Sequence, residues 1–351
     1  MNMQPCISIN IVTWNSLHVL PALLKTIKKQ TFQEYRILII DNGSTDGTIT
    51  FLQEHYPEIM ILRNAKNLGF TTAHNQGIRY AIEHWSQTAL ENCFILVTNP
   101  DTLWTPTFLE ELMKEAELHL QAGSFGGKLF RAFSENGADE IFKETVHSDI
   151  LDSTGLRAHH NRTFTDRGAG ELDQGQYDDY QDVFGHSGAL VFYRASALQD
   201  TRFEDEFFDQ DFFAYKEDID LAWRFQQKGW ESRYVPKAVA YHYRGMFGAE
   251  KMNWLDRISN RQTKSMQRNY YSNRNQWNLL MKNERFFNFC LAAPFILFSE
   301  VLRFLYVLFF ETKNLCAFGE ALMRTPKMWR KRRVCLQHSP VRSKEMRIWF
   351  S

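Results

Sequence analysis

Three carboxylates stand within four positions where the sequence predicts the start of an apolar helix. They are Glu217, Asp218 and Asp220, in the stretch "FFAYKEDIDLAWRFQQKGW" (212–230). Residues three, four and seven apart lie on one helix face, so Asp218 shares its face with the apolar side chains Leu221, Ala222 and Phe225. Backbone N–H groups at a helix start favour an ionised carboxylate. An ionised carboxylate beside a packed wall suits a general base, and the same position also suits a simple helix cap.

The other two carboxylates are predicted to face solvent. Glu217 and Asp220 line up with Arg224 on the opposite side of the helix. Asp220 and Arg224 are also spaced for an ordinary i,i+4 ion pair. The sequence therefore predicts a polar ridge that faces water, with Asp218 alone turned toward the packed side.

Composition excludes several classes of protein. The 351 residues suffice for one large domain with extensions or for two domains. Lys plus Arg and Asp plus Glu both number 41, so there is no electrostatic reason to expect a nucleic-acid partner. The five cysteines are scattered and form no C-x-x-C pair, which argues against a disulfide framework or a structural zinc site and favours a reducing compartment. No secretory signal is predicted at the N-terminus.

The first 130 residues alternate between strand and helix patterns. Strands are predicted over 7–13, 35–44, 58–64 and 93–101, and helices over 17–30, 45–56 and 71–85. This alternation is typical of an α/β fold with a mostly parallel sheet and right-handed crossovers. Ligands of such sheets bind beyond the carboxyl ends of the strands. Each predicted strand ends in polar residues, which are Thr13 to Asn15, Asp41 to Asp46, Asn64 to Asn67, and Asn99 to Asp101.

The middle of the chain is less regular. Residues 131–182 are polar and contain glycine, and we expect long surface loops that form one wall of a cleft. A strand is predicted over 184–198, where small residues allow the backbone to approach a ligand. The segment 232–248 carries His242, and residues 253–283 are predicted to be helical.

Residues 285–310 are apolar and long enough to span a membrane, but Pro294, Glu300 and Arg303 interrupt them. Each charge at a bilayer centre costs about 2.5–3.5 kcal/mol, although Glu300 and Arg303 are spaced to pair. Both flanks of the segment are basic, so a single crossing would leave one cluster on the wrong side. We therefore favour a helix pair lying in the membrane interface. A soluble helical subdomain or a dimer interface is the alternative.

Several stretches together resemble the inverting glycosyltransferases of family 2, which have a GT-A fold. The stretches follow the family's order, and they are "ISINIVTWN" (7–15), "IIDNGSTDGT" (39–48), "NAKNLGFTTAHNQGI" (64–78), "VTNPD" (97–101), "GHSGALVFYRASAL" (185–198), residues 207–230 and "VAYHYRG" (239–245). The later "YYSNRNQWNLLMKN" (270–283) is similar to the tail of the rhamnosyltransferase-like branch. The resemblance implies a GT-A catalytic domain over 1–250 and a helical, partly hydrophobic C-terminal region over 251–351.

The resemblance also implies which residues bind the nucleotide-sugar donor. Asp41 matches the aspartate that accepts from the base or ribose, and Thr13 and Asn15 close around the same nucleoside. Asn67 and Gly69 lie in a loop that leaves room for the nucleotide. Where the family often carries arginine, this chain has His74, so a phosphate contact is not expected there.

"NPD" stands where many relatives carry Asp-x-Asp, the motif that holds a divalent metal, Mn²⁺ or Mg²⁺, on the diphosphate. Here Asp101 is the one carboxylate, and Asn99 offers a neutral donor contact. His242 matches a family histidine that completes the metal site. We therefore expect Asp101 and His242 as metal ligands, with weaker metal binding than in relatives that have more anionic ligands.

With the resemblance, Asp218 matches the family's catalytic base. The implied function is transfer of a sugar, with dTDP-rhamnose as the first choice of donor, to a hydroxyl of a glycan or polyprenyl-linked glycan in cell-surface polysaccharide synthesis. The expected location is the cytoplasmic face of the membrane, as a peripheral protein, with a homo-oligomer as an option. Two alternatives are a nucleotidyltransferase, although "TWNSLHVLP" lacks a glycine-rich basic loop, and a non-catalytic scaffold on the same fold.

Overall fold

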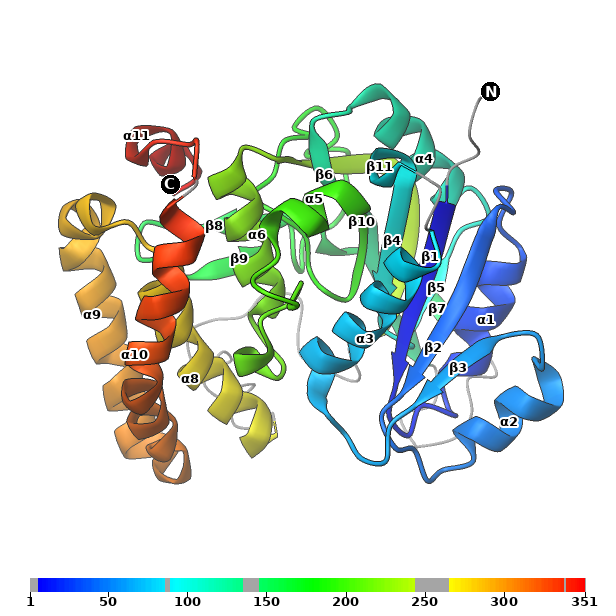
Figure 1. Ribbon diagram of the computed structural model, residues 1–351, viewed down its shortest axis with the longest axis horizontal. Coiled ribbons are helices and arrows are strands. Elements are labelled where there is room, and N and C mark those ends of the chain that lie inside the picture. Colours follow the sequence, from blue (N-terminus) through cyan, green and yellow to red (C-terminus); the bar gives the residue numbers. More distant parts are fainter. Residues whose placement is uncertain (1–5, 86–88, 135–144, 244–264, 338, 351) are drawn as a thin grey trace.

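A computed structural model describes residues 6–85, 89–134, 145–243, 265–337 and 339–350. One nine-stranded sheet forms its centre, and helices cover both faces of that sheet (Figure 1). The strands are β1 (Cys6–Thr13), β2 (Tyr35–Asp41), β3 (Met60–Arg63), β4 (Cys93–Thr98), β5 (Thr102–Trp104), β6 (Ala122–Ser134), β7 (Thr145–Ser153), β10 (Leu190–Arg194) and β11 (Glu231–Tyr243). A separate hairpin consists of β8 (Leu156–Ala158) and β9 (Phe164–Asp166).

The sheet is mostly parallel, as predicted. Its strand order is β3-β2-β1-β4-β10-β6-β11-β5, with β7 paired to β6. The strands β3, β2, β1 and β4 are parallel neighbours, whereas β10, β5 and β7 run antiparallel to the strands beside them. All of the elements predicted for the first 130 residues are present. The carboxyl ends of β1, β2, β3 and β4 consequently lie along one edge of the sheet.

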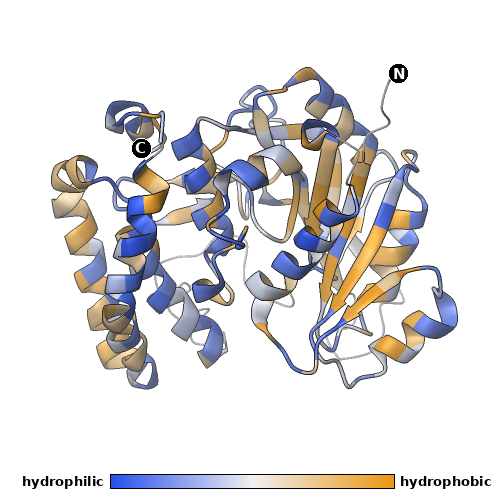
Figure 2. Ribbon diagram, in the orientation of Figure 1, coloured by the Kyte–Doolittle hydropathy of each residue, from blue (hydrophilic) through white to orange (hydrophobic). Residues whose placement is uncertain are grey.

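Apolar residues of the strands pack against helices on both faces. One core lies beneath α1 (Leu20–Lys28), α2 (Thr48–His55) and α4 (Phe108–Leu118). The other lies beneath α3 (Gly69–Glu83), α5 (Ala195–Thr201) and α6 (Glu217–Lys228). Because both faces are covered, the central strands are hydrophobic along their length rather than alternating (Figure 2).

Two predictions for the middle of the chain need correction. Residues 131–182 are not simply surface loops, because they contain the end of β6, all of β7 and the β8–β9 hairpin. Four consecutive residues of this region, Leu151 to Thr154, are buried by pairing and packing that the local sequence does not reveal. The strand predicted over 184–198 is shorter, since β10 covers only Leu190–Arg194 and α5 follows at once.

The C-terminal region is helical, as predicted. It contains α8 (Met266–Asn283), α9 (Phe286–Phe310), α10 (Cys316–Gln337) and α11 (Ser343–Met346), at the end of the molecule opposite α1 and α2 (Figure 1). Within the described residues, α9 is the one helix long and apolar enough to cross a membrane, and 17% of that apolar window is buried. Glu300 and Arg303 form the predicted ion pair. Hydrophobic residues recur along α9 although it lies on the outside (Figure 2).

Candidate active site

Polar residues that follow the parallel strands contact one another at the carboxyl edge of the sheet. The Thr13 hydroxyl, at the end of β1, donates to Asp41 Oδ1 at the end of β2 over 3.1 Å. Asp41 Oδ2 accepts the backbone N–H groups of Gly43 and Ser44 at 3.2 and 3.1 Å. The fully buried Asp41 side chain therefore orders the turn after β2. Its contact with a base or ribose stays a prediction.

Asn15 joins the same two strand ends. Its backbone N–H donates to Ser44 Oγ at 2.9 Å, and its Oδ1 accepts the N–H of Thr45 at 2.8 Å. The φ of Asn15 is 51°, in the left-handed region, which asparagine tolerates better than most residues do. The structure thus brings Thr13, Asn15 and Asp41 together, as the sequence predicted.

Asn67 and Gly69 continue this network at the start of α3. Asn67 Oδ1 accepts the N–H of Gly69 at 2.8 Å, and Asn42 Nδ2 donates to the carbonyl oxygen of Gly69 at 3.2 Å. Asn64, which follows β3, donates to Asn42 Oδ1 at 3.0 Å. Gly69 has a φ of 85°, and a Cβ there would lie 2.6 Å from a ring carbon of Phe213. The glycine therefore admits Phe213, which belongs to the loop before α6.

The segment that leads into β10 links the predicted donor residue to the predicted base. The N–H of Asn99 donates to the carbonyl oxygen of Ala189 at 2.8 Å. One residue earlier, the N–H of Gly188 donates to Asp218 Oδ2 at 2.9 Å. Asp218 Oδ1 accepts from the N–H of Ile219 at 2.8 Å. Asn99 and Asp218 are therefore held by neighbouring residues of one backbone segment.

Asp218 is partly buried, and its surroundings raise its pKa. Burial is the largest cause and the charge of Asp166 adds to it, whereas the N–H groups of Gly188 and Ile219 act in the opposite direction. Burial, followed by the charge of Asp218, raises the pKa of Glu217 well above its usual value. The two neighbouring carboxyl groups therefore differ: two N–H groups stabilise the ionised form of Asp218, whereas burial and the charge of Asp218 favour the neutral form of Glu217.

The predicted polar ridge is wrong. Glu217 and Asp220 are 6% and 0% exposed, and Arg224 is 3% exposed. The predicted ion pair between Asp220 and Arg224 is present at 3.0 Å, but it is buried. Helix α8 covers this side of α6, where Lys282 Nζ and Asn283 Nδ2 each donate to Asp220 at 2.8 Å. Distant residues thus supply the partners that let a charged face enter the interior.

The loop before α6 is strained, and α8 holds it. Phe213, Tyr215 and Lys216 have φ values of 63°, 69° and 70°, in the left-handed region that non-glycine residues rarely adopt. Such conformations cost about 1–3 kcal/mol each and cluster at functional sites. Asn275 Nδ2, on α8, donates to the carbonyl oxygens of Ala214 and Tyr215 at 2.9 and 2.7 Å. The C-terminal region therefore fixes the backbone that delivers Asp218.

The two predicted metal ligands meet beside β11. His242 Nε2 lies 3.5 Å from Asp101 Oδ1, and His242 Nδ1 lies 2.8 Å from Asp152 Oδ2 on β7. Burial lowers the pKa of His242, but the hydrogen bonds and charges of Asp101 and Asp152 outweigh burial and raise it to about 9. Among the described residues, no group of three or more His, Cys, Asp or Glu side chains is arranged to hold a metal.

His74 forms no hydrogen bond with this network. Its side chain is fully buried on α3, between the rings of Phe70 and Phe208, whose centroids lie 4.2 and 6.0 Å away. Burial lowers its pKa to about 3, so the imidazole is neutral at physiological pH. In this structure it is a packing residue.

Sequence reasoning missed two residues near the site. Trp14 follows Thr13 at the end of β1 and is 56% exposed, and an unburied tryptophan beside donor residues was the available signal. Asp152 had no signal, because the segment that contains it was predicted to be loop. Its carboxylate orients His242, which a metal-ligating histidine commonly requires.

A comparison with protein families decides the class of this site. Residues 8–200 match the family described as Glycosyl transferase family 2, and residues 145–323 match Glycosyl transferase family group 2. The chain belongs to glycosyltransferase family 2. The predicted enzyme class is therefore confirmed, and the activity is glycosyl transfer from a nucleotide sugar.

Individual proteins that resemble this glycosyltransferase share a third or less of their aligned residues with it. It is 27% identical over 246 residues to the N-acetylglucosaminyl-diphospho-decaprenol L-rhamnosyltransferase of Mycobacterium tuberculosis, covering 66% of this chain and 74% of that protein. It is 32% identical over 113 residues to the uncharacterized glycosyltransferase YwdF of Bacillus subtilis, covering 32% of this chain and 38% of that one. The crystal structure of S. aureus TarS matches with a TM-score of 0.50 at 14% identity, over 95% of this chain and half (50%) of the TarS chain. The TarS likeness concerns the fold, and it agrees with the predicted GT-A class.

Proposed function

We propose that this glycosyltransferase moves a sugar, with inversion, from a nucleotide sugar to a hydroxyl of a lipid-linked glycan. The first choice of donor is dTDP-rhamnose, and similarity to the mycobacterial rhamnosyltransferase supports it. The observation that carries the proposal is the environment of Asp218. Its carboxylate is held by two backbone N–H groups, next to the segment that binds Asn99, and its pKa is raised by burial.

The proposed reaction is a single displacement. Asp218 takes the proton from the acceptor hydroxyl, and the hydroxyl oxygen attacks the anomeric carbon. The bond between that carbon and the diphosphate oxygen breaks on the opposite face, so a nucleoside diphosphate leaves and the configuration inverts. A base whose pKa is raised toward neutrality suits this role. The donor is bound, or its site is shaped, by the residues at the strand ends and the start of α3, which are Thr13, Asn15, Asp41, Asn67 and Gly69. Asn99 offers the donor a side chain amide.

Asp101 and His242 fit a metal site with two protein ligands. Asp101 Oδ1 is buried and lies 3.5 Å from His242 Nε2, while Asp152 orients the imidazole through Nδ1. Carboxylate and imidazole groups would hold Mn²⁺ or Mg²⁺, with the diphosphate completing its coordination. When bound, the ion neutralises negative charge on the leaving diphosphate.

The metal proposal is testable by nucleotide binding. Asp101→Ala and His242→Ala should each weaken binding of the nucleoside diphosphate by about tenfold or more in Mn²⁺ or Mg²⁺. In EDTA their affinities should match that of the unmodified protein. His84→Ala, at an exposed histidine just after α3, is the control and should bind normally. Metal dependence that survives unchanged in His242→Ala would remove that residue from the site.

We also propose that the chain works at the cytoplasmic face of the membrane, with 251–351 as the membrane-facing region. Support comes from the exposed apolar side chains of α9 and from basic residues such as Lys327 and Arg330 on α10. Each basic residue near an anionic leaflet contributes about 1 kcal/mol. The proposed boundary between 1–250 and 251–351 lies outside the described residues.

A panel of sugar nucleotides tests the proposed function. The purified full chain should release nucleoside diphosphate from dTDP-rhamnose faster than from UDP- or GDP-sugars, and faster still with a lipid-linked glycan. NMR of the product should show an anomeric configuration opposite to that of the donor. Retained configuration would refute the single displacement, and preference for another donor would refute the rhamnose assignment.

A further inference from the structure

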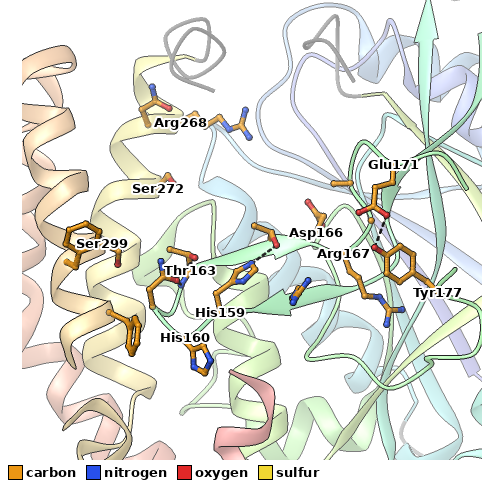
Figure 3. Close-up of a pocket in the computed structure, with 18 of the residues that line it drawn as sticks. His159, His160, Thr163, Asp166, Arg167, Glu171, Tyr177, Arg268, Ser272 and Ser299 are labelled. Carbon is orange, nitrogen blue, oxygen red and sulfur yellow. Dashed lines mark hydrogen bonds between the residues drawn. The ribbon is translucent and has the colours of Figure 1, made fainter. Parts of the chain in front are cut away.

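A cavity of about 1380 Å³ lies between the β8–β9 hairpin and the helices α8 and α9 (Figure 3). The hairpin and the segment after it form one wall, and α8 contributes Arg268 and Ser272 from its first turns. The third wall is the middle of α9, from Pro294 to Ser299. None of the residues assigned above to the donor or the metal lines this cavity.

One side of the cavity is cationic. Arg157, at the hairpin, is exposed and forms no hydrogen bond or ion pair with the described residues. Arg268 extends from α8 toward the hairpin (Figure 3). His160 stacks on Phe295 of α9, with ring centroids 5.9 Å apart. Arg167 also lines the cavity, and its guanidinium donates to the backbone and hydroxyl of Thr154.

Two carboxylates, Asp166 and Glu171, also line the cavity. Glu171 Oε2 accepts from the Tyr177 hydroxyl at 2.9 Å and from Gln176 Nε2 at 3.3 Å, which fixes it on the hairpin side. Counting Arg157, Arg167 and Arg268, the arginines outnumber the carboxylates. The wall therefore favours an anionic group, such as a phosphate, over a neutral or cationic one.

The opposite side of the cavity opens onto an apolar stripe. Phe295 and Phe298 line the cavity, and side chains at spacings of three and four continue the same face of α9. These side chains are all exposed, and they are Leu291 (51%), Phe295 (58%), Phe298 (67%), Leu302 (52%), Leu305 (39%) and Phe309 (71%). At 1.5 Å per residue the stripe is about 27 Å long. Exposed apolar surface of this extent marks a binding surface.

The hairpin wall of the cavity packs against elements that position Asp218. The hairpin is joined to the segment before β10 by the N–H of Leu156, which donates to the carbonyl oxygen of Gly185 at 2.8 Å. Leu156 and Ala158 of the hairpin share a core with Trp223 of α6. Asp166, in the cavity, lies close enough to Asp218 to raise its pKa. A molecule bound in the cavity therefore contacts a hairpin that packs on the helix carrying the proposed base.

We propose that this cavity holds the acceptor, an amphiphile whose phosphate groups contact Arg157, His160 and Arg268 and whose hydrocarbon chain follows the stripe on α9. The proposal rests on the proposed function and names the acceptor's binding site. A sugar attached to the phosphate end is the part of such a molecule that reaches Asp218. The occupant is amphiphilic because the cationic wall and the apolar stripe meet in one cavity.

Binding of a fluorescent farnesyl diphosphate analogue to the full chain tests this site. The titration is done in EDTA, so that no metal holds the diphosphate. Arg157→Gln and Phe298→Ser should each weaken binding by about tenfold. Two matched controls should bind as the unmodified chain does: Arg333→Gln, which removes an exposed arginine from α10, and Leu297→Ser, which removes a 54% exposed leucine from α9 away from the stripe.

Competition separates the two parts of the ligand. Unlabelled farnesyl diphosphate should displace the probe far better than inorganic pyrophosphate or farnesol alone. Displacement by pyrophosphate at equal concentration would show an anion site without the stripe and overturn the proposal. A loss in Leu297→Ser equal to that in Phe298→Ser would show general adhesion to α9 and overturn it as well. Donor consumption by the unmodified chain tests the proposed function separately, since it needs no prenyl ligand.

Discussion

Replacing Asp218 by asparagine should lower the rate of sugar transfer by about 10²- to 10⁴-fold, the range that a lost general base costs. Asparagine keeps the size of the side chain but cannot accept a proton from the acceptor hydroxyl. The donor residues at the ends of β1 and β2 are not altered, so nucleotide binding should stay close to that of the unmodified protein. Transfer is measured with a saturating donor, and nucleotide affinity by calorimetry.

Glu217→Gln is the matched control for this prediction. Burial and the neighbouring Asp218 raise the pKa of Glu217 well above its usual value, which favours the neutral form that glutamine mimics. We expect Glu217→Gln to keep most of the activity. If it lost as much activity as Asp218→Asn, Glu217 would be the better candidate for the base.

The pH dependence gives a second test of Asp218. A base must be ionised to accept a proton, so kcat/KM should fall as the pH drops through the pKa of the coupled Glu217–Asp218 pair. Because burial raises the pKa of Asp218, this fall should occur at a higher pH than for an ordinary aspartate. A flat acid limb down to pH 4 would contradict the assignment.

The strand ends were predictable from sequence because periodicity and polar termini are local features. Alternating strands and helices predicted a parallel sheet, and parallel strands bring their carboxyl ends to one edge. Thr13 and Asp41 lie 28 positions apart and still form a direct hydrogen bond for this reason. Helical spacing did not rank the three carboxylates correctly, because Glu217 and Asp220 are buried and Asp218 is only partly buried, and the link of Asp218 to Gly188 was not predictable either.

The burial of α6 was not predictable from its own sequence. A face with Glu217, Asp220 and Arg224 has the pattern of a solvated ridge. It is buried because Lys282 and Asn283, at the end of α8, donate hydrogen bonds to Asp220. They lie 62 and 63 residues after Asp220 in the chain. Partners so distant in the chain leave no trace in local periodicity. The β7 strand escaped prediction for a related reason, since its burial depends on pairing with β6.

The same buried charges carry the largest expected effect on stability. Lys282 is fully buried, and its Nζ lies 2.7 Å from Asp209 Oδ2 and 2.8 Å from Asp220 Oδ2. Lys282→Met removes the charge at similar side chain length and leaves two buried carboxylates with less compensation. We expect the free energy of unfolding to fall by about 3–5 kcal/mol. Urea unfolding followed by circular dichroism measures the loss.

Lys327→Met is the matched control. Lys327 lies on α10 and pairs with Asp211 at 2.6 Å, but its side chain is 49% exposed. Its partner Asp211 is 10% exposed but keeps Arg324 and Lys331 as partners, so loss of the solvated Lys327 charge should cost about 0–1 kcal/mol and leave the unfolding midpoint close to that of the unmodified protein. Equal losses of unfolding free energy in the two variants would show that the contribution of Lys282 to stability does not depend on its burial.

Acidification separates the ionic contribution of Lys282 from a mere packing defect. Burial alone would raise the pKa of Asp209, but Lys282 and Lys331 outweigh burial and hold it below its usual value. A carboxylate with a depressed pKa in the folded state stabilises the protein above its unfolded pKa of about 4, and that contribution is lost as the pH falls toward the folded pKa. Removing Lys282 makes the pKa of Asp209 in the folded state less depressed. The stability gap between the unmodified protein and Lys282→Met should therefore be widest near pH 7 and should narrow below about pH 4. A gap independent of pH would instead indicate that the variant loses packing alone.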